Sequence, residues 1–158
     1  MTGYRSRMAL LSAWRRVRRE SRPAADPHYR HRRREVAAPI DARVTVLIPT
    51  LERYPYLYRL LDQLRRQTVV PHEVIVIDQT PLAERDEELS DAYSDLPIHV
   101  IYQDEPGQCT SRNEGIIRST GDWILLLDDD VEVEDDLLER HLRCCIGFEA
   151  EVSSGVAE

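Results

Sequence analysis

Between residues 44 and 148, short apolar runs alternate with segments in which apolar residues recur at helical spacing. A short apolar run bounded by turn-forming or acidic residues is typical of a β-strand. We therefore predict four strands: Val44–Ile48, Glu73–Ile77, Ile98–Tyr102 and Trp123–Leu127. Four helices are predicted to follow them: Tyr54–Gln67, a short surface helix over Ala83–Tyr93, a helix over about 109–119, and a last helix from Asp135 or Asp136 through Cys145.

This alternation of strand and helix predicts an α/β fold with a mainly parallel sheet flanked by helices. In open sheets of this kind, ligands bind beyond the carboxyl ends of the strands. The polar segments that follow the four predicted strands should therefore meet at one edge of the sheet. These segments are Pro49–Arg53, Asp78–Thr80, Gln103–Gln108 and Asp128–Asp130.

The strongest chemical signal is a run of three carboxylates, Asp128-Asp129-Asp130, directly after an apolar strand. In an extended chain, Asp128 and Asp130 point to one side and Asp129 to the other. Carboxylates this close raise one another's pKa unless a cation lies between them. Hard oxygen ligands on a short segment suit Mg²⁺ or Mn²⁺ shared with substrate phosphates. A solvated acidic turn is the simpler alternative, and we favour the functional interpretation because the run adjoins a buried strand.

Three other classes of acidic or glycine-rich site do not fit. A calcium-binding EF-hand loop that begins at Asp128 would have Val133 where the turn requires glycine. A phosphoaspartate receiver domain uses a lysine, and the chain contains none. A dinucleotide-binding loop needs clustered glycines, whereas Gly107, Gly115 and Gly121 are widely spaced.

Charge is distributed unevenly along the chain, which carries a net charge of -8. Residues 1–43 hold twelve arginines and four acids, whereas residues 44–158 hold nine arginines and twenty-five acids. We interpret residues 1–40 as an Arg-rich, disordered arm, and attraction to an anionic membrane surface is the sharper alternative. Nucleic acid is not an expected partner, because the arm lacks interleaved aromatic residues and a known binding module.

The three cysteines, Cys109, Cys144 and Cys145, are odd in number and two of them are adjacent. A disulfide framework is therefore not expected, and a reducing, cytoplasmic location is predicted. No run approaches the roughly 20 apolar residues that cross a bilayer. The arm would place the chain at the inner membrane face if it binds anionic lipid.

Taken together, the segments resemble the family 2 glycosyltransferases, whose donor-binding half has the A-type glycosyltransferase fold, a nucleotide-diphospho-sugar transferase-like architecture. The resemblance covers about residues 44–140 and follows one order along the chain. It consists of Val46-Leu47-Ile48-Pro49-Thr50 with Arg53, then Pro71–Asp78, then Gly107 and Arg112-Asn113-Glu114-Gly115-Ile116, then Gly121–Asp130.

The resemblance implies a role for each matching residue. Thr50 and Glu52 would line the base and ribose pocket, and Asp78 would accept a hydrogen bond from the base. Arg112 would lie against the nucleotide, with Asn113 bracing its loop. Asp128 would bind ribose or a metal-bound water, and Asp130 would bind Mg²⁺ or Mn²⁺. The nucleotide-sugar-binding set also includes three further residues, Pro49, Arg53 and Asp129.

Two positions depart from the family pattern and bear on the choice of base. Glu52 stands where the family usually has asparagine, and Gln79 stands where a small or acidic residue is common. The alternative role for Asp78 is a strand-end aspartate that caps a turn. The base of the donor is therefore left open.

The resemblance implies a metal-dependent donor domain for a nucleoside-diphosphate sugar, over residues 41–150, with a frayed tail over 151–158. It also implies inverting transfer to an acceptor hydroxyl of a saccharide or lipid-linked molecule, in cell-envelope polysaccharide biosynthesis. We expect the chain to be truncated, with the general base beyond residue 158, and expect no transfer by this chain alone. The alternatives are a non-catalytic nucleotide-sugar-binding fragment, a regulatory module, or a membrane-surface adaptor that acts through the arm.

If the arm binds anionic lipid, each arginine near the surface contributes on the order of 1 kcal/mol, less at high salt. Deletion of residues 1–40 should then release the chain from acidic liposomes in co-sedimentation without changing nucleotide binding. Neutral liposomes serve as the control. Sedimentation that is the same with and without the arm would contradict the membrane role.

Overall fold

The structure is a computed structural model that describes residues 41–155. The predicted arm over residues 1–40 and the last three residues, 156–158, lie outside the described residues. The elements are β1 (Val44–Thr50), α1 (Tyr54–Leu64), β2 (Glu73–Asp78), the 3-10 helix η1 (Leu82–Glu84), α2 (Leu89–Ala92), β3 (Ile98–Tyr102), α3 (Gln108–Arg118), β4 (Trp123–Leu126) and α4 (Leu137–Phe148).

All four predicted strands are present, and they form one parallel sheet in the order β3-β2-β1-β4. Strand β1 is central, with β2 and β4 as its two neighbours. It is buried along nearly its whole length, as expected for a parallel strand covered on both faces. The predicted α/β fold with helices on both faces is therefore confirmed.

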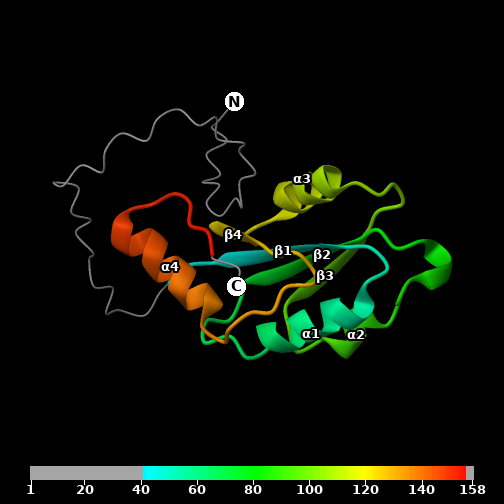
Figure 1. The fold of residues 1–158 in the computed structure, drawn as a ribbon, viewed down its shortest axis with the longest axis horizontal. Coiled ribbons are helices and arrows are strands. Elements are labelled where there is room, and N and C mark those ends of the chain that lie inside the picture. Colours follow the sequence, from blue (N-terminus) through cyan, green and yellow to red (C-terminus); the bar gives the residue numbers. More distant parts are fainter. Residues whose placement is uncertain (1–40, 156–158) are drawn as a thin grey trace.

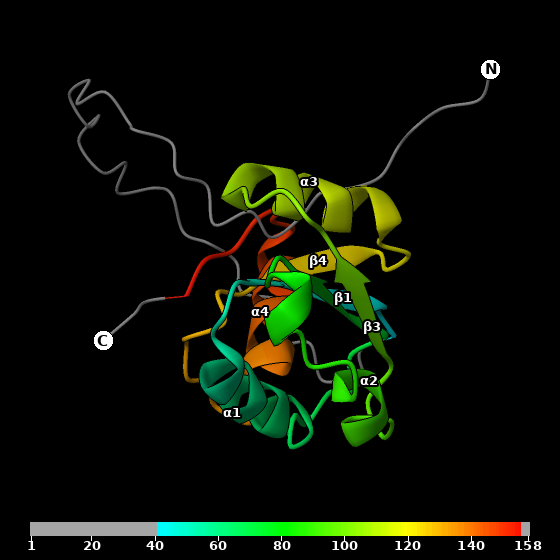
Figure 2. The same cartoon turned by 90° about the vertical axis from the view of Figure 1, so that its right-hand side faces the viewer.

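The helices divide unequally between the two faces of the sheet. Helix α3 covers one face alone, and α1 and α2 cover the other (Figures 1 and 2). The larger core cluster joins the apolar face of α1 to Leu138 and Leu142 of α4. This face of α1 consists of Leu57, Leu60, Leu61 and Leu64. The smaller cluster lies under α3 around Leu47, Ile75 and Ile77.

The predicted helix over Ala83–Tyr93 is wrong, because the segment contains η1 and the four-residue α2 with a break between them. Side chains take over the hydrogen bonding at the break. Arg85 Nε donates to the carbonyl oxygen of Thr80, and Asp86 Oδ1 accepts the backbone N–H of Glu88. An aspartate that bonds to the backbone two residues on favours a turn over a helix.

At the amino ends of the strands, a buried carboxylate joins β1, β2 and the turn before β4. Glu73 Oε1 accepts the Thr45 hydroxyl at 2.6 Å and both the backbone N–H and the hydroxyl of Thr120. Burial acts to raise the pKa of Glu73, but the hydrogen bonds from Thr45, Thr120 and Gly121 outweigh it and hold that pKa below its ordinary value. The acid is therefore stable as a buried anion.

Gly121 lies against β1 where the chain enters β4. A Cβ atom there would lie 2.7 Å from the backbone nitrogen of Thr45 and 2.9 Å from the carbonyl oxygen of Arg43. Because backbone atoms of a central strand cannot move aside, Gly121→Ala should lower the free energy of unfolding by about 1–3 kcal/mol, measured by urea denaturation. Gly155→Ala is the control, since its nearest contact would be 3.8 Å away. Equal stability of the two variants would contradict the argument.

Candidate functional site

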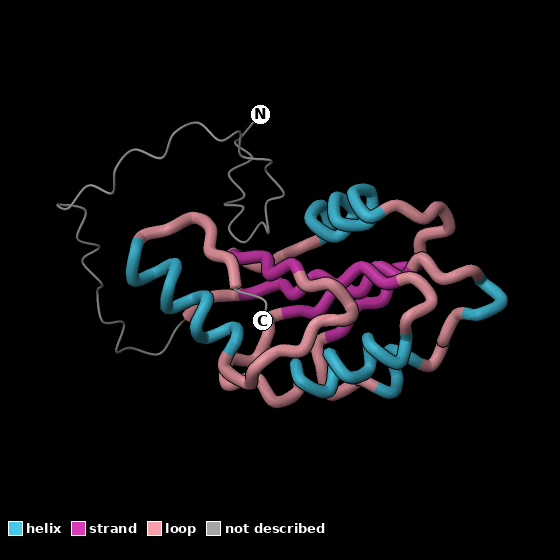
Figure 3. The backbone as a smooth tube through the Cα atoms, viewed as in Figure 1, coloured by secondary structure: helices cyan, strands magenta, loops and turns pink. Residues whose placement is uncertain are grey.

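The loops that follow the strands lie at one edge of the sheet (Figure 3). A pocket of about 570 Å³ is lined by residues of these loops. All four post-strand segments singled out from the sequence contribute to its wall. The lining residues are Pro49, Thr50, Leu51, Arg53, Gln79, Pro106, Gly107, Gln108, Asp128, Asp129 and Asp130. The lining residues that were not given binding roles from the sequence are Leu51, Gln79, Pro106, Gly107 and Gln108.

The three aspartates after β4 differ in their surroundings. Asp129 is buried, at 5% exposure, and its Oδ2 accepts the Thr50 hydroxyl at 2.7 Å. The side chains of Asp128 and Asp130 are about half exposed. Asp129 thus faces inward and its two neighbours outward, as predicted, but Asp129 and Asp130 lie in a turn beyond β4 and not in an extended strand.

Two arginines hold the exposed aspartates. Arg53 Nη2 donates to Asp130 Oδ2 at 2.7 Å, and its Nη1 lies 3.6 Å from Asp129 Oδ1. Arg112 Nη2 donates to Asp128 Oδ1 at 2.6 Å. The Nε of Arg112 is buried and has no partner among the described residues. An unpaired buried donor beside a pocket is suited to an anionic ligand such as a phosphate oxygen.

The segment that follows the three aspartates is held by two glutamines, Gln63 near the end of α1 and Gln67 just after the helix. Gln63 Oε1 accepts the backbone N–H of Val133 at 2.9 Å. The carboxamide of Gln67 donates to the Glu134 carbonyl oxygen at 2.7 Å and accepts the backbone N–H of Leu138 at 3.1 Å. Neither glutamine was given a role from the sequence. The predicted helix extended through Gln67, but α1 ends at Leu64, so Gln67 lies in the loop after the helix.

Four of the expected site residues do not line the pocket: Glu52, Asp78, Arg112 and Asn113. Asp78 is fully buried, and it is not among the residues that line the pocket. Its Oδ1 accepts the backbone N–H of Thr80 at 2.9 Å and its Oδ2 accepts the Tyr54 hydroxyl at 2.6 Å. Asn113 is exposed on α3, also outside the pocket wall.

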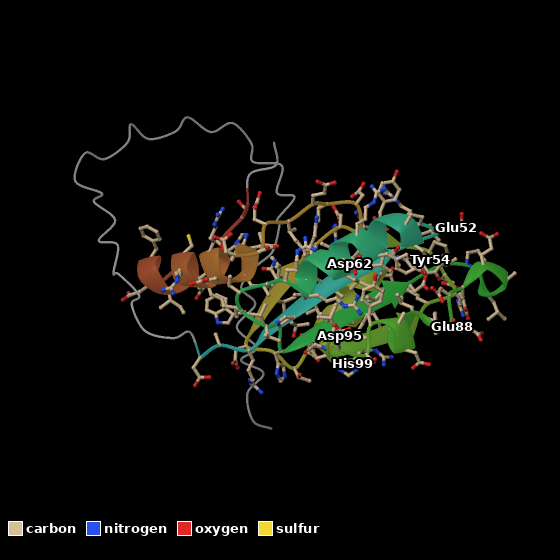
Figure 4. The ribbon with its side chains drawn as sticks, turned by 90° about the horizontal axis from the view of Figure 1, so that it is seen from below. Glu52, Tyr54, Asp62, Glu88, Asp95 and His99 are labelled. Carbon is tan, nitrogen blue, oxygen red and sulfur yellow. The ribbon has the colours of Figure 1, made fainter. Side chains whose placement is uncertain are left out.

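Glu52 lies in the loop after β1, in the left-handed region of backbone space at φ 56°. Its backbone N–H donates to the Thr80 hydroxyl at 2.9 Å, which joins the loops that follow β1 and β2. Figure 4 shows Glu52 and Tyr54 close together at the start of α1, with Glu88 at the same end of the molecule. The loops around the pocket are thus tied to one another by side-chain hydrogen bonds.

The acidic residues fit a divalent cation that is shared with a ligand. Asp128 and Asp130 offer hard carboxylate oxygens at the mouth of the pocket, and each has only one oxygen engaged by an arginine. Within residues 41–155, no group of three or more His, Cys, Asp or Glu side chains is placed to hold an ion. Mg²⁺ or Mn²⁺ held by one or two carboxylates would keep several waters and take further ligands from phosphates.

The fold and the pocket define the class of protein. The chain resembles the solved mannosyltransferase PcManGT from Pyrobaculum calidifontis, in complex with GDP-Man and Mn²⁺, with a TM-score of 0.56 and 25% identity over 66% of this chain and 32% of that one. The parallel sheet, its helices and this likeness identify the A-type glycosyltransferase fold. The family model described as glycosyl transferase family 2 matches residues 45–146, more than half of the chain. The chain belongs to glycosyl transferase family 2, and the resemblance read from its motifs is confirmed.

Two curated bacterial relatives show the same relationship. The chain is 35% identical to the glycosyltransferase YwdF of Bacillus subtilis over 89 residues, which cover 56% of this chain and 32% of that protein. It is 30% identical to the amylovoran biosynthesis glycosyltransferase AmsB of Erwinia amylovora over 106 residues, which cover 65% of this chain and 35% of that protein. The chain thus spans about a third of the length of these relatives. No helix in residues 41–155 has the length and apolar character needed to cross a membrane.

The buried carboxylate of Asp129 should make the stability of the fold depend on pH. Burial raises the pKa of Asp129, and the hydrogen bond from Thr50 and the charge of Arg53 only partly offset it. A raised pKa means that the folded chain binds this proton more tightly than the unfolded chain does. The contribution of Asp129 to stability therefore falls as pH rises through the interval between its unfolded and folded pKa values.

Asp129→Asn should consequently stabilise the unliganded fold at pH 7, by roughly 1 kcal/mol, or a few degrees in melting temperature. The gain should vanish below about pH 4, where the aspartate is protonated in both states. Thermal melts between acid and neutral pH measure this. Asp128→Asn, at an exposed ion-paired position, is the control and should give a smaller change. If Asp129→Asn were less stable than the unmodified chain at pH 7, the conclusion that burial raises the pKa of Asp129 would be contradicted.

Proposed function

We propose that the chain binds a nucleoside-diphosphate sugar in the pocket at the carboxyl edge of the sheet, for inverting transfer of the sugar to an acceptor hydroxyl. The observation that carries the proposal is the meeting of three aspartates and Arg53 at one pocket, with Arg112 paired to the pocket residue Asp128, in a family 2 chain. Such an arrangement offers oxygen ligands for a cation and guanidinium donors for the diphosphate.

In this proposal Asp130 and Asp128 hold Mg²⁺ or Mn²⁺, which when bound neutralises charge on the departing diphosphate. The complex of PcManGT with Mn²⁺ and GDP-Man supports a cation at such a site. Arg112, through its unpaired Nε, and Arg53 bind phosphate oxygens. Asp129 stays on the inner side and orients Thr50 through their hydrogen bond.

The remaining residues of the proposed site surround the nucleoside. Pro49 and Thr50 at the end of β1 line the pocket, and Glu52 continues the same loop toward the base and ribose. Asp78 keeps its proposed place at the base end, where it lies behind the pocket wall. Asn113, which is exposed on α3, would brace the loop that precedes the helix.

During transfer, the bond from the anomeric carbon to the diphosphate oxygen breaks as the acceptor oxygen bonds to that carbon from the opposite side, which inverts its configuration. The acceptor proton passes to a carboxylate base, and we assign no residue among 41–155 to that role. The acceptor is a saccharide or a lipid-linked molecule of the cell envelope. The name of the relative AmsB, with its amylovoran biosynthesis, supports polysaccharide synthesis. Three free cysteines favour a reducing, cytoplasmic location.

Nucleotide binding should depend on metal, because the diphosphate would otherwise meet the uncompensated charge of the aspartates. UDP or GDP at about 100 times its dissociation constant should stabilise the fold by about 2.7 kcal/mol with Mn²⁺ or Mg²⁺ present. Asp130→Asn should abolish this gain in a thermal-shift assay and leave the unliganded fold intact.

Asp122→Asn is the matched control, since Asp122 is also half exposed and paired with an arginine, but lies at the amino ends of the strands. This variant should respond to the nucleotide as the unmodified chain does. Equal stabilisation by nucleotide in excess chelator would reject the metal-linked site.

A further inference from the structure

The order of the strands in the sheet determines where the residues that follow each strand lie along the pocket. The acids follow β4 at one end of the pocket, whereas Gln79 follows β2 and touches Gly107 in the loop after β3. Strand β2 lies two strand spacings from β4, or about 10 Å. That separation matches the reach of a nucleoside diphosphate from its outer phosphate to its base. With the diphosphate at the aspartates, as proposed above, the base lies beside Gln79.

The orientation of the Gln79 carboxamide is determined by its neighbour. The backbone N–H of Gly107 donates to one end of the carboxamide, and an N–H can only donate, so that end is the oxygen Oε1. The other end is therefore the donor Nε2. The backbone of Gln79 is also held, because its N–H donates to the Thr50 carbonyl oxygen at 2.9 Å.

The Nε2 group has no hydrogen-bond partner among the described residues, although Gln79 is only 6% exposed. The residue is nevertheless part of the pocket wall. Because Nε2 is not among the buried polar atoms that lack a partner, it is open to the solvent of the pocket and free to donate to a ligand. A ligand that displaces this water without supplying an acceptor would cost about 1–3 kcal/mol. Carbonyl oxygens of a nucleobase are acceptors of the right kind.

The neighbouring acid is less well placed to read the base from within the pocket. The backbone N–H of Asp86 donates to the Tyr54 hydroxyl at 2.9 Å, so the hydroxyl proton of Tyr54 is directed to Asp78 Oδ2. With Thr80 on its other oxygen, Asp78 braces the loop from behind. Gln79, the next residue, is the one that reaches the pocket surface.

We infer that Gln79 is a specificity-determining residue, whose Nε2 donates to a base carbonyl and so selects uracil, thymine or guanine donors over adenine donors. Adenine carries no carbonyl. Its ring acceptors N1 and N7 both adjoin the N6 amino group, whose hydrogens would oppose the Nε2 donor because Oε1, which could accept from them, is already engaged by Gly107. The inference rests on the proposed function and deepens it. It also accounts for a polar carboxamide at a position where the family commonly has a small or acidic residue.

The test measures dissociation constants by calorimetry for UDP, GDP, ADP and inorganic pyrophosphate, with Mn²⁺, on the full chain. The unmodified chain should bind UDP or GDP at least about tenfold more tightly than ADP, the effect of about one hydrogen bond. Gln79→Met keeps the volume and removes the donor, so it should reduce that ratio about tenfold. Its affinity for pyrophosphate should stay unchanged. Gln79→Glu retains an oxygen for Gly107 and should lose the same preference.

Gln108→Met is the control, because Gln108 lines the same pocket but is exposed. It can shift the affinity for all nucleotides together, and the ratio between bases should not change. An unchanged ratio in both Gln79 variants, no preference against ADP in the unmodified chain, or loss of pyrophosphate binding in the Gln79 variants would overturn the inference. Failure of the unmodified chain to bind any diphosphate with Mn²⁺ would instead reject the proposed function.

Discussion

The constraint on which this structure depends is the central place of β1 in a parallel sheet covered on both faces. Strands β2 and β4 pair with it on either side, so the three carboxyl ends coincide. Thr50 at the end of β1 is therefore within hydrogen-bond distance of Asp129 after β4, although the two are far apart in sequence. The pocket forms here because parallel pairing places the loops that follow these strands at the same edge of the sheet.

The two ends of the sheet treat carboxylates in opposite ways. At the amino ends, Glu73 is buried and fully supplied with hydrogen bonds from Thr45 and Thr120, so its charge is part of the fold. At the carboxyl ends, Asp78 and Asp129 are likewise buried and hydrogen-bonded, but Asp128 and Asp130 are half exposed and held by arginines that a ligand can engage instead. A charge that is satisfied internally stabilises, whereas a charge left accessible is available for binding.

Helix α1 links the core to the site. Its leucines pack into the larger hydrophobic cluster, which fixes the helix against the sheet. Arg53, just before the helix, pairs with Asp130, and Gln63 and Gln67 hold the backbone of the segment that follows the aspartates. The acidic segment is thus held by Gln63 of α1 and by residues just before and just after the helix, which limits the positions its carboxylates can adopt without ligand.

The sequence by itself determined the four strands, the parallel α/β fold and the edge at which Asp128–Asp130 meet the loops. Those features follow from burial, and burial leaves a periodic pattern in the chain. Only the tertiary structure decided that residues 83–93 break into two short helices and that Asp78 faces inward while Gln79 reaches the pocket. These outcomes depend on hydrogen bonds with Tyr54 at the start of α1, with Thr80 in the loop after β2, and with Gly107 in the loop after β3. Hydrogen bonds of this kind produce no periodic pattern in the sequence, because they depend on which loops the folded sheet brings within hydrogen-bond distance.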